Sequence, residues 1–188
     1  MFYPLGLYTS DCSFLELKTH SKIKRGDEME KPITMYPIGI VHSPYMEAKG
    51  TPIQGIFADK AVAWVELKEE YVEGLKDLDG FSHAILLYHF HMSDREDIVG
   101  KPYLEKEKHG IFSIRIPHRP NHIGFSIVKI EKIEGNKLYF TEVDVLDGTP
   151  VLDIKPYVKQ YDCRPDAMSG WIEKHFKDGK SPEHTTAQ

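Results

Sequence analysis

Alternating apolar and polar residues dominate the chain from residue 36 onward, and this period of two predicts β-strands. The alternation runs through residues 38–43, 81–92, 111–116, 125–133 and 137–145. Residues 61–67 are apolar enough to predict a strand buried on both faces. Gly135-Asn136 predicts a hairpin turn, and Asp147-Gly148 predicts a second turn before a short strand at 151–154. Strands joined by short turns predict a mainly β fold, an antiparallel barrel or sandwich.

Helical spacing is found at two places, and both predicted helices are short. Residues 69–77 predict a helix whose apolar stripe consists of Tyr71, Val72, Leu75 and the following Leu78. Residues 166–176 predict a C-terminal helix whose stripe is Met168, Trp171, Ile172 and His175.

The first 34 residues lack any sustained periodicity. Basic side chains crowd there, at Lys18, Lys22, Lys24 and Arg25. The pattern favours a disordered or loosely packed extension, and the alternatives are a basic arm for a polyanion or a natural start at Met29 or Met35. We therefore predict an extension over 1–34, a β-barrel domain over 35–165, and a C-terminal helix and tail over 166–188.

Composition narrows the class of protein. The chain has 188 residues and a formal net charge of -5, so nucleic-acid binding would need a local basic patch. Its two cysteines fit no metal or redox motif, and its apolar runs are too short to span a bilayer. With no signal-peptide pattern, a cytoplasmic protein without a membrane partner is expected. Neither a GxGxxG fingerprint nor a P-loop is present, which argues against a Rossmann nucleotide site.

Residues 81–92 carry three histidines on one predicted strand face, namely His83, His89 and His91. His89 and His91 are spaced to grip one metal ion, whereas His83 would lie about 20 Å away at ~3.3 Å per residue. No carboxylate falls within the strand to complete a metal site. We favour histidines that are hydrogen-bonded at the rim of a barrel.

Residues 115–124 combine two prolines with cationic and donor-rich side chains. The prolines stiffen a loop that holds Arg115, His118, Arg119 and His122. Arginine binds carboxylate or phosphate through paired hydrogen bonds, so this loop predicts an anion site rather than a merely solvated turn. It is also the local basic patch that a nucleic-acid partner would need.

Residues 144–157 place acid–base groups around a turn and a strand. Asp153 and Lys155 share a face by the period of two, as does Tyr157 if the strand continues through Pro156. A carboxylate beside an ammonium and a phenol can perform proton transfer, but an ordinary ion pair at a sheet edge would look the same.

Four motifs in series resemble those of the TsaA-like, or TrmO-type, proteins. They are PIGIVHSPY at 37–45, LDGFSHAILLYHFH at 78–91, GIFSIRIPHRPNHIG at 110–124 and DVLDGTPVLDIKPY at 144–157, and the resemblance covers 36–162. It implies a small β-barrel that binds S-adenosylmethionine without a Rossmann fold. It also implies homodimers and methyl transfer to N6 of N6-threonylcarbamoyladenosine at position 37 of tRNA, beside the anticodon.

Carried over motif by motif, the resemblance also implies roles for individual residues. The cofactor site would comprise Pro52, Ile53, Gln54, His91, Met92, Arg115, Phe125, Leu146, Asp147, Gly148 and Thr149. Two positions depart from the family pattern, since Ile53 replaces a usually basic residue and His122 replaces a proline. Arg115 could hold the cofactor carboxylate or a tRNA phosphate, and His118 and Arg119 are the expected tRNA contacts.

The acceptor nitrogen must lose a proton, and the fourth motif supplies the candidates to accept or orient it. Asp153 is the first candidate base, with Lys155 and Tyr157 beside it. Two other kinds of function remain open at this point. One is a non-catalytic RNA-binding module that uses Arg115, His118 and Arg119, and the other is a metalloenzyme that uses His89 and His91.

Overall fold

The structure, a computed structural model, describes residues 32–58, 60–176, 182 and 185–187. The chain divides into two compact units, Met1–Thr34 and Met35–Gln188, and the second unit contains every element described below. The predicted extension over 1–34 lies almost wholly outside the described residues. The division into an extension, a barrel domain and a C-terminal part therefore stays a prediction. No helix in the described part of the chain is long and apolar enough to cross a membrane.

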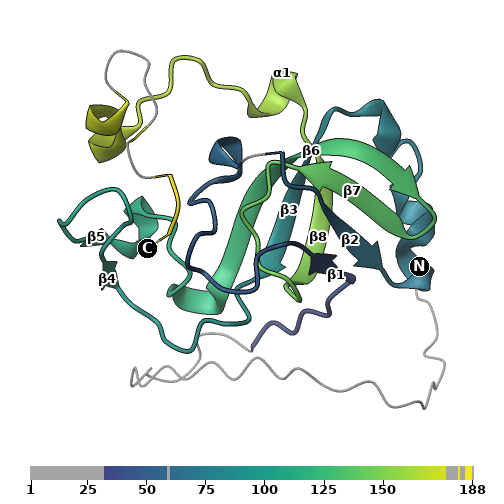
Figure 1. The fold of residues 1–188 in the computed structure, drawn as a ribbon, viewed down its shortest axis with the longest axis horizontal. Helices are drawn as coiled ribbons and strands as arrows, with labels where there is room; N and C mark the ends of the chain where they lie inside the picture. The colour runs from purple at the N-terminus through teal and green to yellow at the C-terminus, as the bar shows by residue number, and fades with distance from the viewer. Residues whose placement is uncertain (1–31, 59, 177–181, 183–184, 188) are drawn as a thin grey trace. The chain divides into compact units, whose positions relative to one another are not determined.

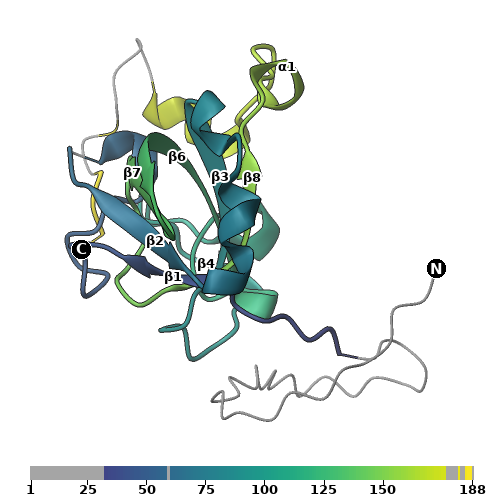
Figure 2. The same cartoon turned by 90° about the vertical axis from the view of Figure 1, so that its right-hand side faces the viewer.

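Six antiparallel strands close into a barrel in the order β1-β2-β7-β6-β3-β8 (Figures 1 and 2). Their bounds are β1 Gly39–His42, β2 Ala63–Leu67, β3 His83–His89, β6 Ile123–Glu134, β7 Lys137–Thr141 and β8 Pro150–Pro156. A separate ribbon pairs β4 (Val99–Gly100) with β5 (His109–Gly110). The predicted mainly β barrel is therefore confirmed.

The inward faces of the strands form one core. Buried side chains alternate with outward ones along β1, β2, β7, most of β3 and the first part of β6. The largest fully buried side chains of this core are Phe140, Leu86, Leu138, Val41, Val65 and Val128. The prediction that residues 61–67 are buried on both faces is wrong. Ala63, Val65 and Leu67 face the core, while Trp64 and Glu66 lie on the outer surface, where Trp64 stacks on His42 at 5.0 Å.

Three strand predictions change at their ends because the backbone turns. The segment 81–92 stops being a strand at His89, where the N–H of His91 donates to the carbonyl of His89 and closes a tight turn. The strand predicted at 137–145 ends at Thr141 because Glu142 takes φ +62°, which breaks an extended ladder. The last strand, predicted at 151–154, extends over all of β8. The hairpin at Gly135 and the turn at Gly148 are confirmed by φ values of +57° and +74°.

The segment 111–116 is not a strand. It begins with a 3-10 turn, η4 (Ile111–Ser113), and continues as irregular backbone. Its three isoleucines are nevertheless buried, in a small second cluster covered by Trp171. Their spacing of three and then two residues satisfies a 3-10 turn followed by extended chain, and no single period describes it.

The predicted helices are reduced to short 3-10 pieces. Residues 69–78 form η2 (Glu69–Leu75) and the start of η3 (Leu78–Gly80), interrupted by Asp77 at φ +65°. The C-terminal helix is limited to η6 (Gly170–His175), because Gly170 takes φ +57° and cannot lie inside a longer helix. An unpredicted single turn, α1 (Lys159–Asp162), precedes it.

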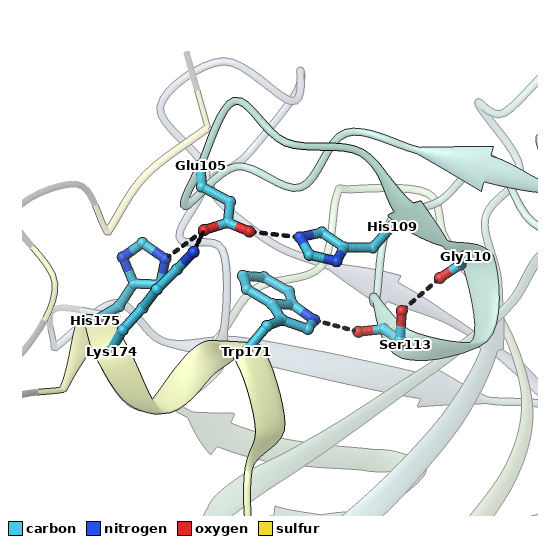
Figure 3. Close-up of polar contacts among 7 residues, drawn as sticks. All are labelled: Glu105, His109, Gly110, Ser113, Trp171, Lys174 and His175. Carbon is cyan, nitrogen blue, oxygen red and sulfur yellow. Dashed lines mark hydrogen bonds and ion pairs between the residues drawn. The ribbon is translucent and has the colours of Figure 1, made fainter.

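Glu105 anchors η6 to the loop that follows β4 (Figure 3). Its carboxylate accepts hydrogen bonds from His109, Lys174 and His175, and the Lys174 contact is the main cause that lowers the pKa of Glu105 to about 2. Beside it, the Trp171 indole stacks on His109 at 4.5 Å and donates to the carbonyl of Ser113. This cluster fixes η6 against the isoleucine cluster.

Beyond η6, residues 185–187 pair with the loop that follows β1. The N–H of Ile53 donates to the carbonyl of Thr185, and the N–H of Ala187 donates to that of Thr51. Pro52 and Thr186 form the bridge between the two stretches. Residues 185–187 thus brace the loop that carries Pro52, Ile53 and Gln54.

Replacing Glu105 with glutamine is expected to loosen this brace, because the neutral amide cannot hold the Lys174 ammonium and two imidazoles together. Hydrogen exchange of the Ile53 and Ala187 amides should become several-fold faster, as measured by mass spectrometry of peptides. Glu96→Gln is the matched control, since Glu96 is exposed and lies outside this charged cluster. Unchanged exchange in E105Q would show that the brace does not depend on Glu105.

Candidate functional site

A cavity of about 540 Å³ opens at one end of the barrel. It lies between the braced loop, the turn after β3, the stiff loop at 115–119, the start of β6, and residues 144–149. Its size falls within the range of about 300–1,000 Å³ typical of small-molecule sites. Chain segments that are distant in sequence therefore meet around one ligand-sized space.

Most of the predicted cofactor residues line this cavity. They are Pro52, Ile53, Gln54, His91, Met92, Arg115, Phe125, Leu146 and Thr149. Asp147 and Gly148 lie behind the wall instead. Asp147 accepts a hydrogen bond from the N–H of Ser43 at 3.0 Å, and the N–H of Gly148 donates to the carbonyl of Val41 at 2.9 Å, so this turn is fastened to β1.

Arg115 is exposed at the cavity wall and is held by two neighbours. Its Nη1 donates to Gln54 Oε1 at 2.8 Å, and its guanidinium carbon lies 5.8 Å from the centre of the Phe125 ring. A guanidinium has five N–H donors, so the remaining ones are available to an anion. Gln54 and Phe125 thereby orient the cation that the sequence predicted as an anion-binding group.

His118 and Arg119 also line the cavity, and both are tied into the stiff loop. The Nδ1 of His118 lies 2.9 Å from Ser93 Oγ, and Arg119 Nη1 donates to the carbonyl of Ile114 at 2.9 Å. Asn121 and His122 both take positive φ, which bends the chain into β6. At His122 the family pattern has a proline. In this chain, hydrogen bonds and the two positive φ angles fix the loop instead.

Asp144, Ser126 and Tyr88 form a polar network beneath the cavity, and sequence reasoning did not assign these residues to the site. Ser126 Oγ donates to Asp144 Oδ1 at 2.6 Å and lies 3.0 Å from the Tyr88 hydroxyl. The N–H of Gly55 donates to Asp144 Oδ2 at 2.9 Å. Ser126 and Tyr88 occupy inward positions of β6 and β3, where an apolar residue would be expected, and this is the signal that could have found them.

Burial governs the ionisation of this network. It raises the pKa of Asp144 to about 6, against the opposing effects of the Ser126 and Gly55 hydrogen bonds and the Arg115 charge. Burial likewise raises the pKa of Tyr88 far above its usual value, so the phenol stays protonated. The Tyr88 ring packs directly against Gly124, where a Cβ atom would lie 2.1 Å from the ring, and only glycine leaves room for it.

The histidines of the second motif do not converge on a metal site. Because β3 ends at His89, His89 and His91 do not share a strand face. His91 Nδ1 lies 3.3 Å from Thr149 Oγ1, and His89 Nδ1 has no hydrogen-bond partner among the described residues. Burial lowers the pKa of both histidines. Within the described residues, the group spaced to hold an ion is Glu105, Glu107 and His109, which includes neither of them.

The predicted catalytic residues lie on the outer face of the barrel. Lys155 Nζ contacts Asp153 Oδ2 at 2.6 Å, and the Tyr157 ring meets the edge of His83 at 6.1 Å. Asp153 is aligned with Leu87, and Leu87 with Phe125, in the register of β8, β3 and β6. With neighbouring strands about 4.8 Å apart, Asp153 lies roughly 10 Å from Phe125 at the cavity rim. The structure thus brings Asp153 and Lys155 together, places Tyr157 beside His83, and leaves all three outside the cavity lining.

Comparison with known proteins agrees with the motif analysis. The family model described as "tRNA-methyltransferase O N-terminal domain" matches residues 40–163. A probable S-adenosyl-L-methionine-binding protein of Pyrococcus abyssi is 50% identical over 139 residues, which cover 74% of this chain and 76% of that protein. The human tRNA (adenine(37)-N6)-methyltransferase is 33% identical over 159 residues, but these cover only 36% of the human protein and 81% of this chain.

Solved structures give the same result for the fold. The crystal structure of TrmO from Pseudomonas aeruginosa matches with a TM-score of 0.64 and 38% sequence identity, over 75% of this chain and 63% of that one. The chain thus spans about a third of the human relative and somewhat under two thirds of the bacterial structure. On the family model and these relatives, the chain belongs to the family of the tRNA-methyltransferase O N-terminal domain.

Proposed function

We propose that this protein is an S-adenosylmethionine-dependent methyltransferase that acts on N6 of N6-threonylcarbamoyladenosine at position 37 of tRNA. The observation that carries the proposal is the convergence of the family's cofactor motifs on one cavity of about 540 Å³. When bound, the cofactor supplies a methyl group made electrophilic by a sulfonium centre. The reaction would take place in the cytoplasm, on the anticodon loop of the tRNA.

The chemistry of the cavity wall fits such a cofactor. S-adenosylmethionine combines a flat base, a carboxylate and fixed positive charge. The cavity offers the Arg115 guanidinium for a carboxylate, the Asp144 carboxylate for a cation, and apolar walls at Phe90, Leu146 and Phe125. Arg115 at the cavity mouth could instead bind a tRNA phosphate, and His118 and Arg119 would then provide further contacts with the tRNA.

An apolar stripe on the outer face of the barrel supports a homodimer. Ile123, Phe125 and Ile127 of β6 are between 36% and 40% exposed and continue across β3 to Ile85 and Leu87. Exposed contiguous apolar surface is typical of an interface. Asp153 and Lys155 border this stripe in register. In a symmetric dimer that buries this stripe, the β8 face of one protomer would lie near the cavity mouth of its partner. Asp153 of one protomer would then approach the partner's cavity, although within one chain Asp153 lies roughly 10 Å from Phe125 at the cavity rim.

Ile127→Glu is expected to weaken the homodimer about tenfold or more, because it places a charge in the middle of the buried stripe. Sedimentation equilibrium measures the dissociation constant. Met168→Glu, which changes a side chain that is 91% exposed elsewhere, serves as the control. An I127E protein that dimerises like the wild type would remove this face as the interface.

Mass spectrometry of tRNA nucleosides tests the reaction. Incubation with labelled S-adenosylmethionine should add one methyl group to threonylcarbamoyl-modified tRNA and none to tRNA that lacks this modification. Asp153→Asn should reduce kcat by about 100-fold or more, as expected for a general base, while cofactor binding is unchanged. Asp79→Asn removes the same charge from an exposed position and should leave the rate unaltered.

The outcomes separate the competing functions. Binding of tRNA without any methyl gain would favour the non-catalytic RNA-binding module. Stoichiometric metal in protein purified without a histidine tag would favour the metalloenzyme. Full activity in D153N would remove Asp153 from the role of base and leave the other assignments intact.

A further inference from the structure

Asp144 is a carboxylate at the floor of the cavity that has no ion-pair partner among the described residues. Each of its oxygens accepts a hydrogen bond, and both donors, Ser126 Oγ and the N–H of Gly55, are uncharged. Arg115 is the basic group whose charge acts on Asp144, but its guanidinium donates to Gln54. Asp144 also lines the cavity, so a ligand there can reach it.

An unpaired carboxylate in such a place is costly, since burial disfavours the ionised form. The surrounding residues keep it in position all the same, through hydrogen bonds from two separate segments. Buried charges in proteins are normally paired or bind a ligand of opposite charge. The arrangement therefore points to a cation that enters the cavity from outside.

We propose that Asp144 recognises the positive charge of the cofactor's sulfonium and thereby distinguishes S-adenosylmethionine from its demethylated product, S-adenosylhomocysteine. This inference rests on the proposed function, because it assumes that cofactor. The two ligands share adenosine, ammonium and carboxylate, and they differ in the methyl group and the charge on sulfur. A carboxylate opposite the sulfur pairs with the sulfonium of S-adenosylmethionine but has no partner in S-adenosylhomocysteine. The Asp144 carboxylate would therefore favour release of the product.

Asparagine is the matched substitution because the network can accept it. Its amide oxygen can receive the Gly55 N–H, and its amide nitrogen can donate to Ser126, whose hydroxyl then donates to Tyr88. Asp144→Asn thus keeps the shape of the side chain and the number of hydrogen bonds while it removes the charge, and it reverses the bond between Ser126 and Tyr88, which takes the Ser126 acceptor from the Tyr88 O–H. Removal of the costly charge and loss of that acceptor act in opposite directions, so D144N without ligand should melt close to the wild type at pH 8.

Calorimetric titration at pH 8 with three ligands tests the proposal. These are S-adenosylmethionine, S-adenosylhomocysteine, and sinefungin, which carries an amine near the position of the sulfonium. D144N should lower the affinity for the first and third relative to the second by about tenfold or more. Asp79→Asn should leave both ratios unchanged. Equal loss for all three ligands, or no loss, would overturn the proposal.

The wild type offers a second readout that does not depend on any variant. Because the pKa of Asp144 is raised to about 6, its charge is present at pH 8 and is lost as the pH falls through 6. The ratio of the two affinities should fall over the same range. Tyr88 and Arg115 face Asp144, and His91 and His118 line the same cavity; burial lowers the pKa of His91. D144N retains those histidines, so their contribution can be subtracted.

Failure of this inference differs from failure of the proposed function. If the wild type binds none of the three ligands, the cofactor assignment is wrong. If it binds them, but the ratios change neither with pH nor in D144N, only the role of Asp144 is wrong.

Discussion

The burial of the Asp144 carboxylate is the constraint around which the site is organised. Its two oxygens link β6, through Ser126, to the start of η1 (Gly55–Phe57), and Ser126 extends the link to Tyr88 on β3. A shift of its pKa from 3.8 to about 6 corresponds to roughly 3 kcal/mol that the ionised form costs the folded protein above pH 6. The cost disappears below the unfolded value near 3.8, so at neutral pH the ionised Asp144 lowers the stability of the empty protein relative to the unfolded chain. Stability lost in this way is typical of a site built for a ligand.

The cavity wall opposite this floor depends on chain that comes from outside the barrel. Loop 50–53 has few partners in the sheet, and residues 185–187 provide it with backbone hydrogen bonds. Those residues follow η6, which Glu105 and Trp171 fasten beside the isoleucine cluster. Gln54, directly after the loop, then orients Arg115. Arg115 is thus oriented by a residue that directly follows a loop paired with residues 185–187, near the C-terminal end of the chain.

Sequence patterns predicted the barrel well, because alternation in a closed sheet directly reports which face is inward. They failed where local backbone geometry takes over. Ile111, Ile114 and Ile116 read as a strand although a 3-10 turn sets their spacing, and Gly170 shortens a helix that its apolar stripe predicted. Motif resemblance placed the cavity residues, but it could not show that Asp147 faces β1, since hydrogen bonds over a hundred residues apart decide that orientation. Asp144 opens the fourth motif, but sequence reasoning gave it no role, because nothing in the sequence shows that an acid is buried until its neighbours are known.

The position of Asp153 bears on how chemistry and binding are divided in this fold. The same three strands carry the cavity network on their inner face, at Tyr88 and Ser126, and the ion pair of Asp153 with Lys155 on their outer face. Successive residues of a strand point to opposite faces, so the inward positions that form the cavity network cannot also carry the exposed ion pair of Asp153 with Lys155. If Asp153 is the base that we propose, either a large substrate reaches around the rim or a second copy brings its outer face to the cavity. The apolar stripe of Ile123, Phe125 and Ile127, which joins the cavity rim to the ion pair, favours the second arrangement, because a polar nucleic acid gains little from covering isoleucine.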